Sequence, residues 1–231
     1  MSTLVECRNL SHSYGKKPAL CDISLTMDSG KIIGLFGPNG SGKTTLIKIL
    51  TGMIRDDKNA VSINGKPVGE GSKAFISYSP DKVVYNAGRK VSSLIDMYEL
   101  MYDDFNRAGA ESMLTELGID KGDVVGKLSK GNAEKLQIIL TMSRKAGLFI
   151  LDEPFNGVDP VAKENIIRIM LKNIPENASV LLSTHQIGDI EQILDEAVFI
   201  KDGRIILHRS VEELRDETGR SLTEKYMEEF R

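Results

Sequence analysis

A glycine-rich octapeptide, GPNGSGKT at residues 37–44, is the feature of this 231-residue chain that most limits its fold. It directly follows residues 32–36, IIGLF, a short apolar run rich in β-branched residues that is typical of a buried strand. After it, the apolar residues within 46–50 have the spacing of one helix face. A strand, a glycine-rich loop and a helix in this order predict an α/β fold with a mainly parallel sheet.

The octapeptide matches the phosphate-binding pattern G-x-x-x-x-G-K-[ST]. Glycines let backbone N–H groups curl around phosphate oxygens, and the following helix points its positive end at the same anion. Lys43 adds a cation for the β- and γ-phosphates of a nucleotide, and the Thr44 hydroxyl is placed to ligate Mg²⁺. The alternative, a glycine-rich turn with a chance lysine, does not explain the strand before it and the helix after it. We therefore predict that the nucleotide is bound by these consecutive residues: Gly37, Pro38, Asn39, Gly40, Ser41, Gly42, Lys43, Thr44 and Thr45.

A second buried-strand pattern, residues 148–151, ends in the carboxylates of Asp152 and Glu153. In a parallel sheet, ligands bind beyond the carboxyl ends of the strands, where the phosphate loop also lies. Asp152 is then expected to hold Mg²⁺ through its water shell, and Glu153 to polarise the attacking water as a general base. Two carboxylates at a strand end also fit a solvated turn, but together with the phosphate loop they predict nucleotide hydrolysis.

A third apolar run, residues 180–182, is followed by Ser183, Thr184 and His185. We expect His185 at the same edge of the sheet, which favours a contact with the γ-phosphate over an incidental histidine. Each of the three runs is predicted to be followed by a helical stretch. For the second run, Asp159 and Pro160 supply the N-cap and the first helical residue.

The remaining segments divide the chain into a core and an insert. From about residue 88 to 146 the apolar residues fall at helical spacing, which predicts a helical insert within the α/β core. The first 30 residues and residues 197–207 are predicted to form antiparallel strands, with a hairpin turn at Asp202 and Gly203 in the second case. No repeat or linker interrupts the sequence, so we predict a single domain over residues 1–231.

Composition argues against several classes of function. The net charge of −3 and the pI of about 5.7 give no basic surface for nucleic acid, so no nucleic-acid partner is expected. No segment approaches the ~18 consecutive apolar residues of a membrane-spanning helix, and the N-terminus lacks the pattern of a signal peptide. Cys7 and Cys21 have no metal-ligand spacing and are expected to be reduced residues of a cytoplasmic protein. Any link to a membrane must therefore come from a partner.

The stretch 128–132, LSKGN, makes the prediction more specific. It resembles the signature sequence of ABC ATPases, and it stands about 20 residues before Asp152, as in that family. Ser129 also suits a helix N-cap, so the motif is weak alone and strong in this order and spacing.

The resemblance extends over essentially the whole chain. Tyr14 lies where ABC ATPases place the aromatic residue that stacks on adenine, residues 156–159 look like their D-loop, and His185 matches their switch histidine. The chain most resembles the short ATPases of Gram-positive two-component ABC exporters of the antibiotic-resistance type. The passages that carry this closer likeness are residues 101–105, 143–146 and 218–222.

The resemblance implies a fold, a mechanism and partners. The fold would be a P-loop NTPase with a RecA-like core, an N-terminal antiparallel β subdomain and an inserted helical subdomain. Two ATP molecules with Mg²⁺ would be sandwiched between two ATPase subunits, where Ser129 and Gly131 contact the γ-phosphate held by the other subunit. ATP hydrolysis would drive an integral membrane permease, a short helix of which enters a groove between the helical insert and the core. The chain would be cytoplasmic, at the inner face of the cell membrane.

Two motifs depart from the family pattern. The signature has Lys130 and Asn132 where the commonest pattern has Gly and Gln, while Ser129 and Gly131 are retained. In the loop after residues 77–79, Asp81 replaces the usual Gln, which ligates Mg²⁺. An aspartate is a Mg²⁺ ligand too, but it is shorter and charged.

Two other classes of protein share part of this pattern. Soluble ABC ATPases of DNA repair or of the ribosome carry long coiled-coil insertions or two ATPase units, whereas here about 85 residues without sustained heptads separate phosphate loop and signature. A small-molecule or nucleoside kinase would share the phosphate loop but lack the signature and the switch histidine. Transport is favoured over both. The transported substrate does not touch such a subunit, so the sequence of the subunit does not specify the substrate. The sequence also does not say whether the dimer is a homodimer or a heterodimer.

Overall fold

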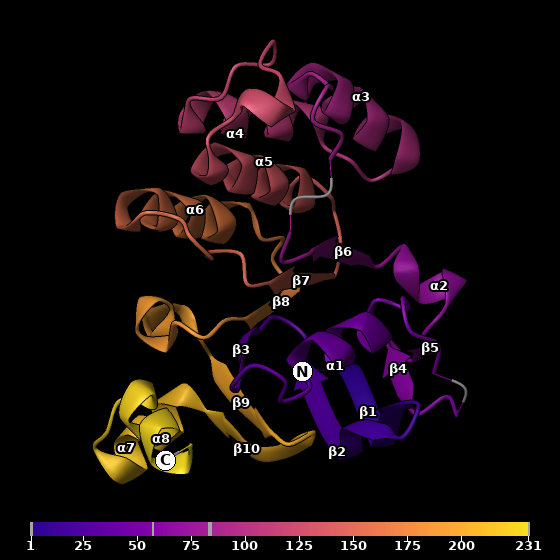
Figure 1. Cartoon of the computed structure of the whole chain (residues 1–231), viewed down its shortest axis with the longest axis vertical. Helices are drawn as coiled ribbons and strands as arrows, with labels where there is room; N and C mark the ends of the chain where they lie inside the picture. Colours follow the sequence, from indigo (N-terminus) through magenta and orange to yellow (C-terminus); the bar gives the residue numbers. More distant parts are fainter. Residues whose placement is uncertain (1, 57, 83–84, 231) are drawn as a thin grey trace.

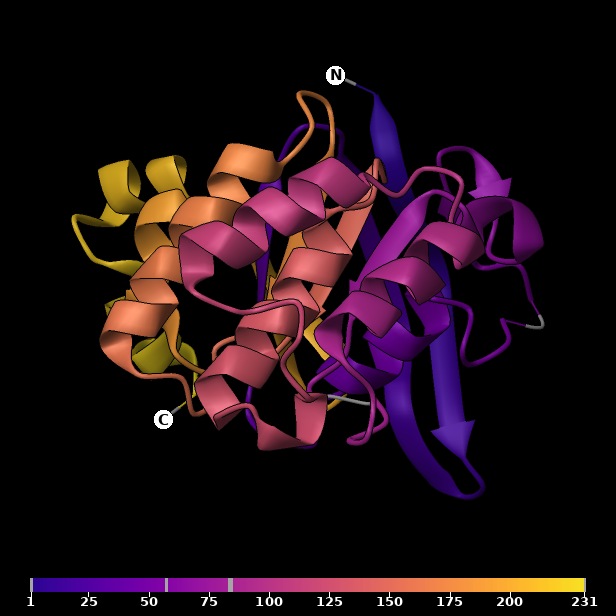
Figure 2. The ribbon, with the colours of Figure 1, turned by 90° about the horizontal axis from the view of Figure 1, so that it is seen from above.

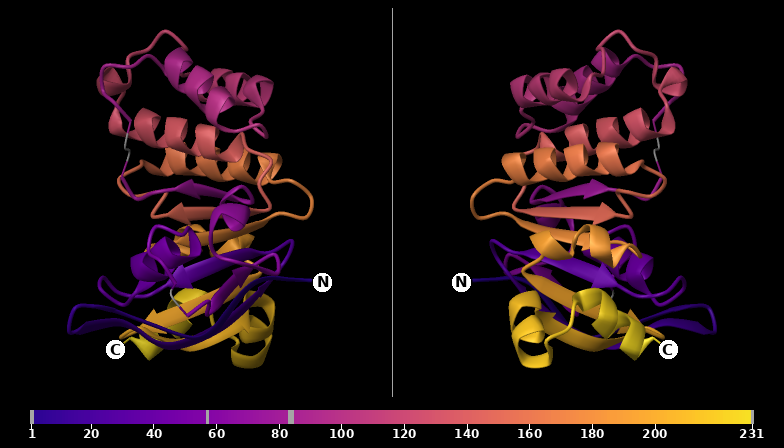
Figure 3. Two further views of the ribbon diagram at one scale, coloured as in Figure 1. Left: turned by 90° about the vertical axis from the view of Figure 1, so that its right-hand side faces the viewer. Right: turned by 90° about the vertical axis from the view of Figure 1, so that its left-hand side faces the viewer.

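A computed structural model of the chain describes residues 2–56, 58–82 and 85–230. A central sheet lies between a helical part, drawn at the top of Figure 1, and a second sheet formed by the N-terminal strands. The side views in Figure 3 show the same stacking of helices, central strands and N-terminal strands.

Six strands form the central sheet in the order β10-β9-β3-β8-β7-β6. All neighbouring strands are parallel except β9 and β10, which are antiparallel. The strand that precedes the phosphate loop, β3, lies between β8 and β9. The bounds are β3 Ile32–Phe36, β6 Ile76–Ser79, β7 Leu148–Asp152, β8 Ser179–Ser183, β9 Glu196–Lys201 and β10 Arg204–Ser210.

The second sheet is antiparallel, in the order β2-β1-β4-β5. Its strands are β1 Thr3–Tyr14, β2 Lys17–Asp28, β4 Val61–Ile63 and β5 Lys66–Pro67. Helix α1, Lys43–Leu50, shares one hydrophobic cluster with strands of both sheets. The short helix α2, Glu70–Lys73, follows β5.

The helical part contains α3 Val91–Met101, α4 Arg107–Leu117 and α5 Lys130–Met142, with the 3₁₀ turn η1 Val125–Lys127 before α5. Helix α6, Pro160–Asn173, lies below α5 in Figure 1, and Figure 2 shows these helices from above. Helices α7 Val211–Thr218 and α8 Leu222–Glu229 end the chain beside β9.

Strand β7 shows why the central strands have continuous apolar sequences. Leu148 and Ile150 belong to the hydrophobic cluster that contains α1, whereas Phe149 and Leu151 belong to the cluster that contains the helices on the other face. All four side chains are fully buried. A parallel strand covered on both faces has no polar side, so its sequence does not alternate.

The predicted fold class is confirmed: the sheet is mainly parallel, the N-terminal sheet is antiparallel and the helices α3–α5 fall between β6 and β7. The predicted hairpin turn is also present, with positive φ at Asp202 (49°) and Gly203 (72°). The expected helix after the third apolar run is absent, so that expectation is wrong. After β8 the chain forms only the 3₁₀ turns η2 Ile187–Asp189 and η3 Glu191–Ile193, because β9 begins at Glu196 and leaves a short connection.

Candidate active site

Four parallel strands deliver the predicted site residues to one edge of the central sheet. The phosphate loop follows β3, Glu153 follows β7 and His185 comes shortly after β8. The strand register pairs Asp152 with Ser183, and the last residue of β6 pairs with Leu151. The loop after β6 therefore carries Asp81 to the same edge, as expected for the carboxyl ends of parallel strands.

A cavity of about 620 Å³ opens at this edge. Its volume lies within the range of sites that hold small-molecule ligands. The predicted residues that line it come from five separate segments: Tyr14, Gly37, Pro38, Asn39, Gly40, Gly42, Lys43, Thr44, Thr45, Asp81, Asp152, Glu153 and His185. Three predicted residues, Ser41, Ser129 and Gly131, do not line it.

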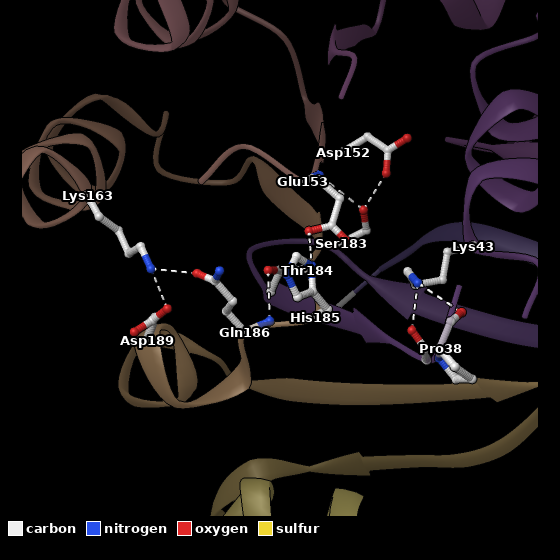
Figure 4. Close-up of polar contacts among 11 residues, drawn as sticks. Pro38, Lys43, Asp152, Glu153, Lys163, Ser183, Thr184, His185, Gln186 and Asp189 are labelled. Carbon is white, nitrogen blue, oxygen red and sulfur yellow. Dashed lines mark hydrogen bonds and ion pairs between the residues drawn. The ribbon is translucent and has the colours of Figure 1, made fainter. Parts of the chain in front are cut away.

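The phosphate loop encloses its own lysine. Lys43 Nζ donates hydrogen bonds to the carbonyl oxygens of Gly37 (2.6 Å) and Pro38 (3.3 Å), as Figure 4 shows. Burial lowers the pKa of the Lys43 ammonium, and the carboxylates of Glu153 and Asp152 partly offset this effect. The ammonium is therefore poorly solvated in the free protein, so an anionic ligand is a better partner than two neutral carbonyls.

Three features of the loop fit a phosphate group. A Cβ at Gly37 would lie 2.2 Å from the Ile200 carbonyl oxygen, so only glycine allows the loop to pack this closely on β9. Gly42 precedes α1 with φ +115°, a conformation that side-chain-bearing residues rarely adopt. The Ser41 Oγ is buried without a hydrogen-bond partner, and an unpaired buried hydroxyl is the kind of group that a bound ligand satisfies.

The oxygen donors of the cavity fit Mg²⁺. Thr44, Asp81 and Asp152 line it together, and hydroxyl and carboxylate oxygens are the protein ligands that this cation takes. Ser183 donates a hydrogen bond from Oγ to Asp152, while burial raises the pKa of the Asp152 carboxyl. Among the described residues no group of three or more His, Cys, Asp or Glu side chains is arranged to hold a metal ion. The hydroxyl and carboxylate oxygens of Thr44, Asp81 and Asp152 suit a cation that keeps several waters and takes further ligands from a nucleotide, as Mg²⁺ does.

Glu153 is held in an unusual conformation. Its φ is +50°, in the left-handed region that non-glycine residues seldom occupy. Its backbone N–H donates to the Ser183 carbonyl oxygen at 3.0 Å, and its Oε2 lies 2.9 Å from His185 Nδ1. Such strain persists only where the surroundings fix the residue, and it is frequent at active sites.

The loop that carries His185 is braced from outside the cavity. Gln186 N–H donates to Thr184 Oγ1 at 3.1 Å. Lys163 Nζ, from α6, donates to Gln186 Oε1 at 2.6 Å and forms an ion pair with Asp189 (Figure 4). These contacts fix the backbone on both sides of the histidine.

Tyr14 stands at the end of β1 with 51% of its surface exposed. Its ring packs edge-to-face on His12, with the ring centroids 5.0 Å apart. Much of the Tyr14 ring therefore stays available to a ligand.

The signature residues lie at the start of α5. Ser129 is its N-cap, and its Oγ accepts a hydrogen bond from the backbone N–H of Asn132 at 3.2 Å. Gly131 has open space where a Cβ would be. Helix α5 therefore begins in an exposed turn that lies outside the cavity of the same chain. The backbone N–H groups of such a first turn favour an anion.

Several residues that line the cavity were not predicted. Lys17, Pro18 and Ala19 begin β2 directly after the hairpin that follows Tyr14, so their nearness to Tyr14 could have suggested them. Asn156 was assigned only to the D-loop. Tyr226 lies on α8 and reaches the cavity because its ring packs against Phe199 of β9, a contact for which the sequence carries no signal.

A parallel sheet with a phosphate loop and two carboxylates at its strand ends defines a P-loop nucleotide hydrolase. The sequence model described as ABC transporter matches residues 20–156, more than half of the chain. The chain therefore belongs to the ABC transporter family, in which it is an ATP-binding subunit that hydrolyses ATP to power transport. Within the described residues no helix has the length and apolar character to cross a membrane. Subunits of this kind form dimers and work with membrane permeases.

Individual relatives agree with this assignment. The chain is 28% identical over 217 residues to the ABC transporter ATP-binding protein YtrB of Bacillus subtilis, covering 93% of this chain and 74% of that protein. It is 29% identical over 222 residues to the lantibiotic transport ATP-binding protein SrtF of Streptococcus pyogenes, covering 89% and 90%. A solved structure described as the ATP-binding subunit of an ABC transporter matches with a TM-score of 0.86 at 28% identity, covering 98% of this chain and 99% of that one.

Proposed function

We propose that the chain binds ATP with Mg²⁺ in the cavity at the sheet edge and hydrolyses it as one half of a dimer, driving a permease. The observation that carries this proposal is the division of the family's motifs. The phosphate loop, Asp152, Glu153 and His185 border one cavity, whereas Ser129 and Gly131 lie outside it. ATP in that cavity meets only half of the motifs, and a second copy supplies the signature.

The residues have separate roles in this proposal. The phosphate-loop amides and Lys43 hold the phosphates, and Tyr14 stacks on adenine. Thr44, Asp81 and Asp152 would hold Mg²⁺, which neutralises charge on the phosphates when bound. The Glu153 carboxylate accepts the proton of the attacking water, and His185 keeps that carboxylate in place and faces the γ-phosphate.

The chain would be a single domain in which the helical insert spans about residues 88–146. The membrane partner would contact this insert. Leu100 and Met101, at the end of α3, are 87% and 61% exposed, which supplies apolar surface beside the core. The subunit would then lie at the cytoplasmic face of the membrane. The likeness to a lantibiotic transport protein supports an exporter.

The test uses Glu153→Gln, which keeps the shape of the side chain but removes the proton acceptor. Unhydrolysed ATP should then hold two chains together. Size-exclusion chromatography with light scattering should report a monomer without nucleotide and a dimer with ATP and Mg²⁺. Wild-type turnover in this variant would contradict the proposed mechanism, whatever the oligomeric state.

A further inference from the structure

The C-terminal helix α8 places a tyrosine in the nucleotide cavity. Tyr226 lines this cavity together with the phosphate loop and His185, although α8 is the last helix of the chain and follows both sheets in the sequence. None of the motifs described above for the nucleotide site includes this residue. Its neighbours show which part of a bound nucleotide its side chain would meet.

The Tyr226 ring is held by two aromatic side chains. It packs edge-to-face on Phe199 of β9, with the ring centroids 5.4 Å apart, and it stacks on Phe230 at a centroid distance of 4.2 Å. The end of α8 is also tied to β9, because Lys201 Nζ donates a hydrogen bond to the Glu229 carbonyl oxygen at 2.9 Å. A side chain that is ordered in this way before binding loses little conformational freedom when it contacts a ligand.

Phe199 connects the Tyr226 ring to the start of the phosphate loop. In the parallel pairing of β3 with β9, Phe199 lies opposite Phe36, and the centroids of these two rings are 6.0 Å apart. Phe36 directly precedes Gly37, the first residue of the phosphate loop. Tyr226 therefore packs beside the strand end from which the phosphate loop begins.

The start of α8 is attached to the segment that follows His185. The Leu222 N–H donates a hydrogen bond to Glu191 Oε1, at the start of η3, at 2.8 Å. A Cβ added to Gly188 would lie 3.8 Å from Thr223 Oγ1, so the first turn of α8 packs against η2, which begins shortly after the histidine. Helix α8 thus bridges the segment after the histidine and the strand beside the phosphate loop.

Tyr226 and Tyr14 approach the cavity from different sides. Tyr226 packs against the hydrophobic cluster that contains the helices α5 and α6. The strands on either side of the Tyr14 hairpin contribute Leu10 and Leu20 to the other cluster, which contains α1. If Tyr14 holds the adenine, Tyr226 therefore meets the nucleotide at its phosphate end, on the side of His185.

The chemistry of the Tyr226 side chain suits a phosphate oxygen. Its hydroxyl is its only polar group, and no hydrogen bond joins this hydroxyl to another of the residues that the structure describes. Burial raises the pKa of the hydroxyl, so it keeps its proton at neutral pH and remains a hydrogen-bond donor. Donation to an anionic oxygen gives a stronger hydrogen bond than donation to a neutral one.

We propose that the Tyr226 hydroxyl donates a hydrogen bond to the terminal phosphate of ATP, which makes the C-terminal helix part of the nucleotide site. The inference rests on the proposed function, because it needs ATP in this cavity with its γ-phosphate toward His185. Helix α8 is fixed both to β9 and to the segment after the histidine. The contact therefore links the C-terminal helix to the presence or absence of the terminal phosphate.

The test compares Tyr226→Phe with the wild-type full chain. The variant keeps the ring that packs on Phe199 and Phe230 but lacks the hydroxyl. Isothermal titration with Mg²⁺ measures Kd for AMP-PNP, whose γ-phosphate is retained, and for ADP, which has none. The Kd for AMP-PNP should rise about tenfold, as for the loss of one hydrogen bond to a charged group, whereas the Kd for ADP should change by less than about twofold.

Two matched controls accompany this variant. Tyr102→Phe removes the hydroxyl of a tyrosine that does not line the nucleotide cavity, and Met227→Ala truncates the exposed neighbour of Tyr226 on α8, which does not line it either. Both controls should bind the two nucleotides as the wild type does. The same selective loss in Met227→Ala would assign the effect to α8 as a whole and overturn the hydroxyl contact.

The remaining outcomes separate this inference from the proposed function. An unchanged Kd for AMP-PNP in Tyr226→Phe would remove the hydroxyl from the site, and equal losses for AMP-PNP and ADP would place its contact away from the terminal phosphate. Either result overturns the inference while nucleotide binding by the wild type still stands. A wild-type chain that binds neither nucleotide would contradict the proposed function itself, and the inference with it.

Discussion

His185 Nδ1 lies 2.9 Å from Glu153 Oε2, and this contact joins the ends of two neighbouring parallel strands. A carboxylate only accepts hydrogen bonds, so the contact requires a proton on Nδ1 whenever Glu153 is ionised. The other ring nitrogen, Nε2, then remains for a ligand. The histidine thereby links the position of the proton acceptor to whatever occupies the phosphate end of the cavity.

We predict that His185→Ala lowers ATP turnover by about 10² while nucleotide affinity changes little, because the Glu153 carboxylate loses its orienting hydrogen bond. Steady-state hydrolysis and isothermal titration check the two quantities. His208→Ala is a matched control: His208 Nε2 pairs with Glu196 at 2.8 Å, but neither residue lines the nucleotide cavity. Turnover lost to the same extent in both variants would point to a general loss of structure.

Tyr14 gives a prediction about affinity rather than rate. Tyr14→Phe should preserve ATP affinity, whereas Tyr14→Ala should weaken it by the ~1–3 kcal/mol of a base–aromatic stack. The exposed ring lines the cavity, so its removal should not disturb the core. Calorimetric titration with ATP measures both variants, and equal losses would implicate the hydroxyl instead of the ring.

The sequence predicted the strand ends well because each combines a buried apolar run with polar residues at its carboxyl end. Asp152, Glu153 and His185 are cases where this local pattern and the rule for parallel sheets suffice. The contact between Glu153 and His185 was not predicted, since it depends on which strands are neighbours, and strand order is set by pairing between distant segments. Tyr226 was missed for a related reason, because it reaches the cavity only through the packing of α8 on Phe199.

The two cysteines should differ in reactivity. Cys7 is 2% exposed, and burial, with smaller contributions from Asp56 and Glu6, raises the pKa of its thiol to about 12. Because the thiolate is the nucleophile, Cys7 should not react with a thiol reagent at pH 8 in the folded protein. Cys21 is partly exposed and should react. Mass spectrometry should therefore find one label on the native chain, two after unfolding in guanidinium, and none on native Cys21→Ser; a label on Cys7 in the native chain would contradict the buried environment.

Lys43 carries the strongest prediction for binding. Its ammonium is buried and hydrogen-bonded to two loop carbonyls, and burial lowers its pKa. Keeping this lysine charged therefore destabilises the folded state fully at pH values below the lowered pKa, and this penalty shrinks as the pH rises from there and is gone above the ordinary lysine pKa. Lys43→Met removes the buried charge, so we expect it to fold with a melting temperature no lower than that of the wild type. It should nonetheless lose ATP affinity by at least tenfold in calorimetric titration, because the phosphates lose their cation. Lys48→Ala, in the same helix but outside the cavity, should bind ATP as the wild type does. Full affinity in folded Lys43→Met would show that the loop amides alone hold the nucleotide.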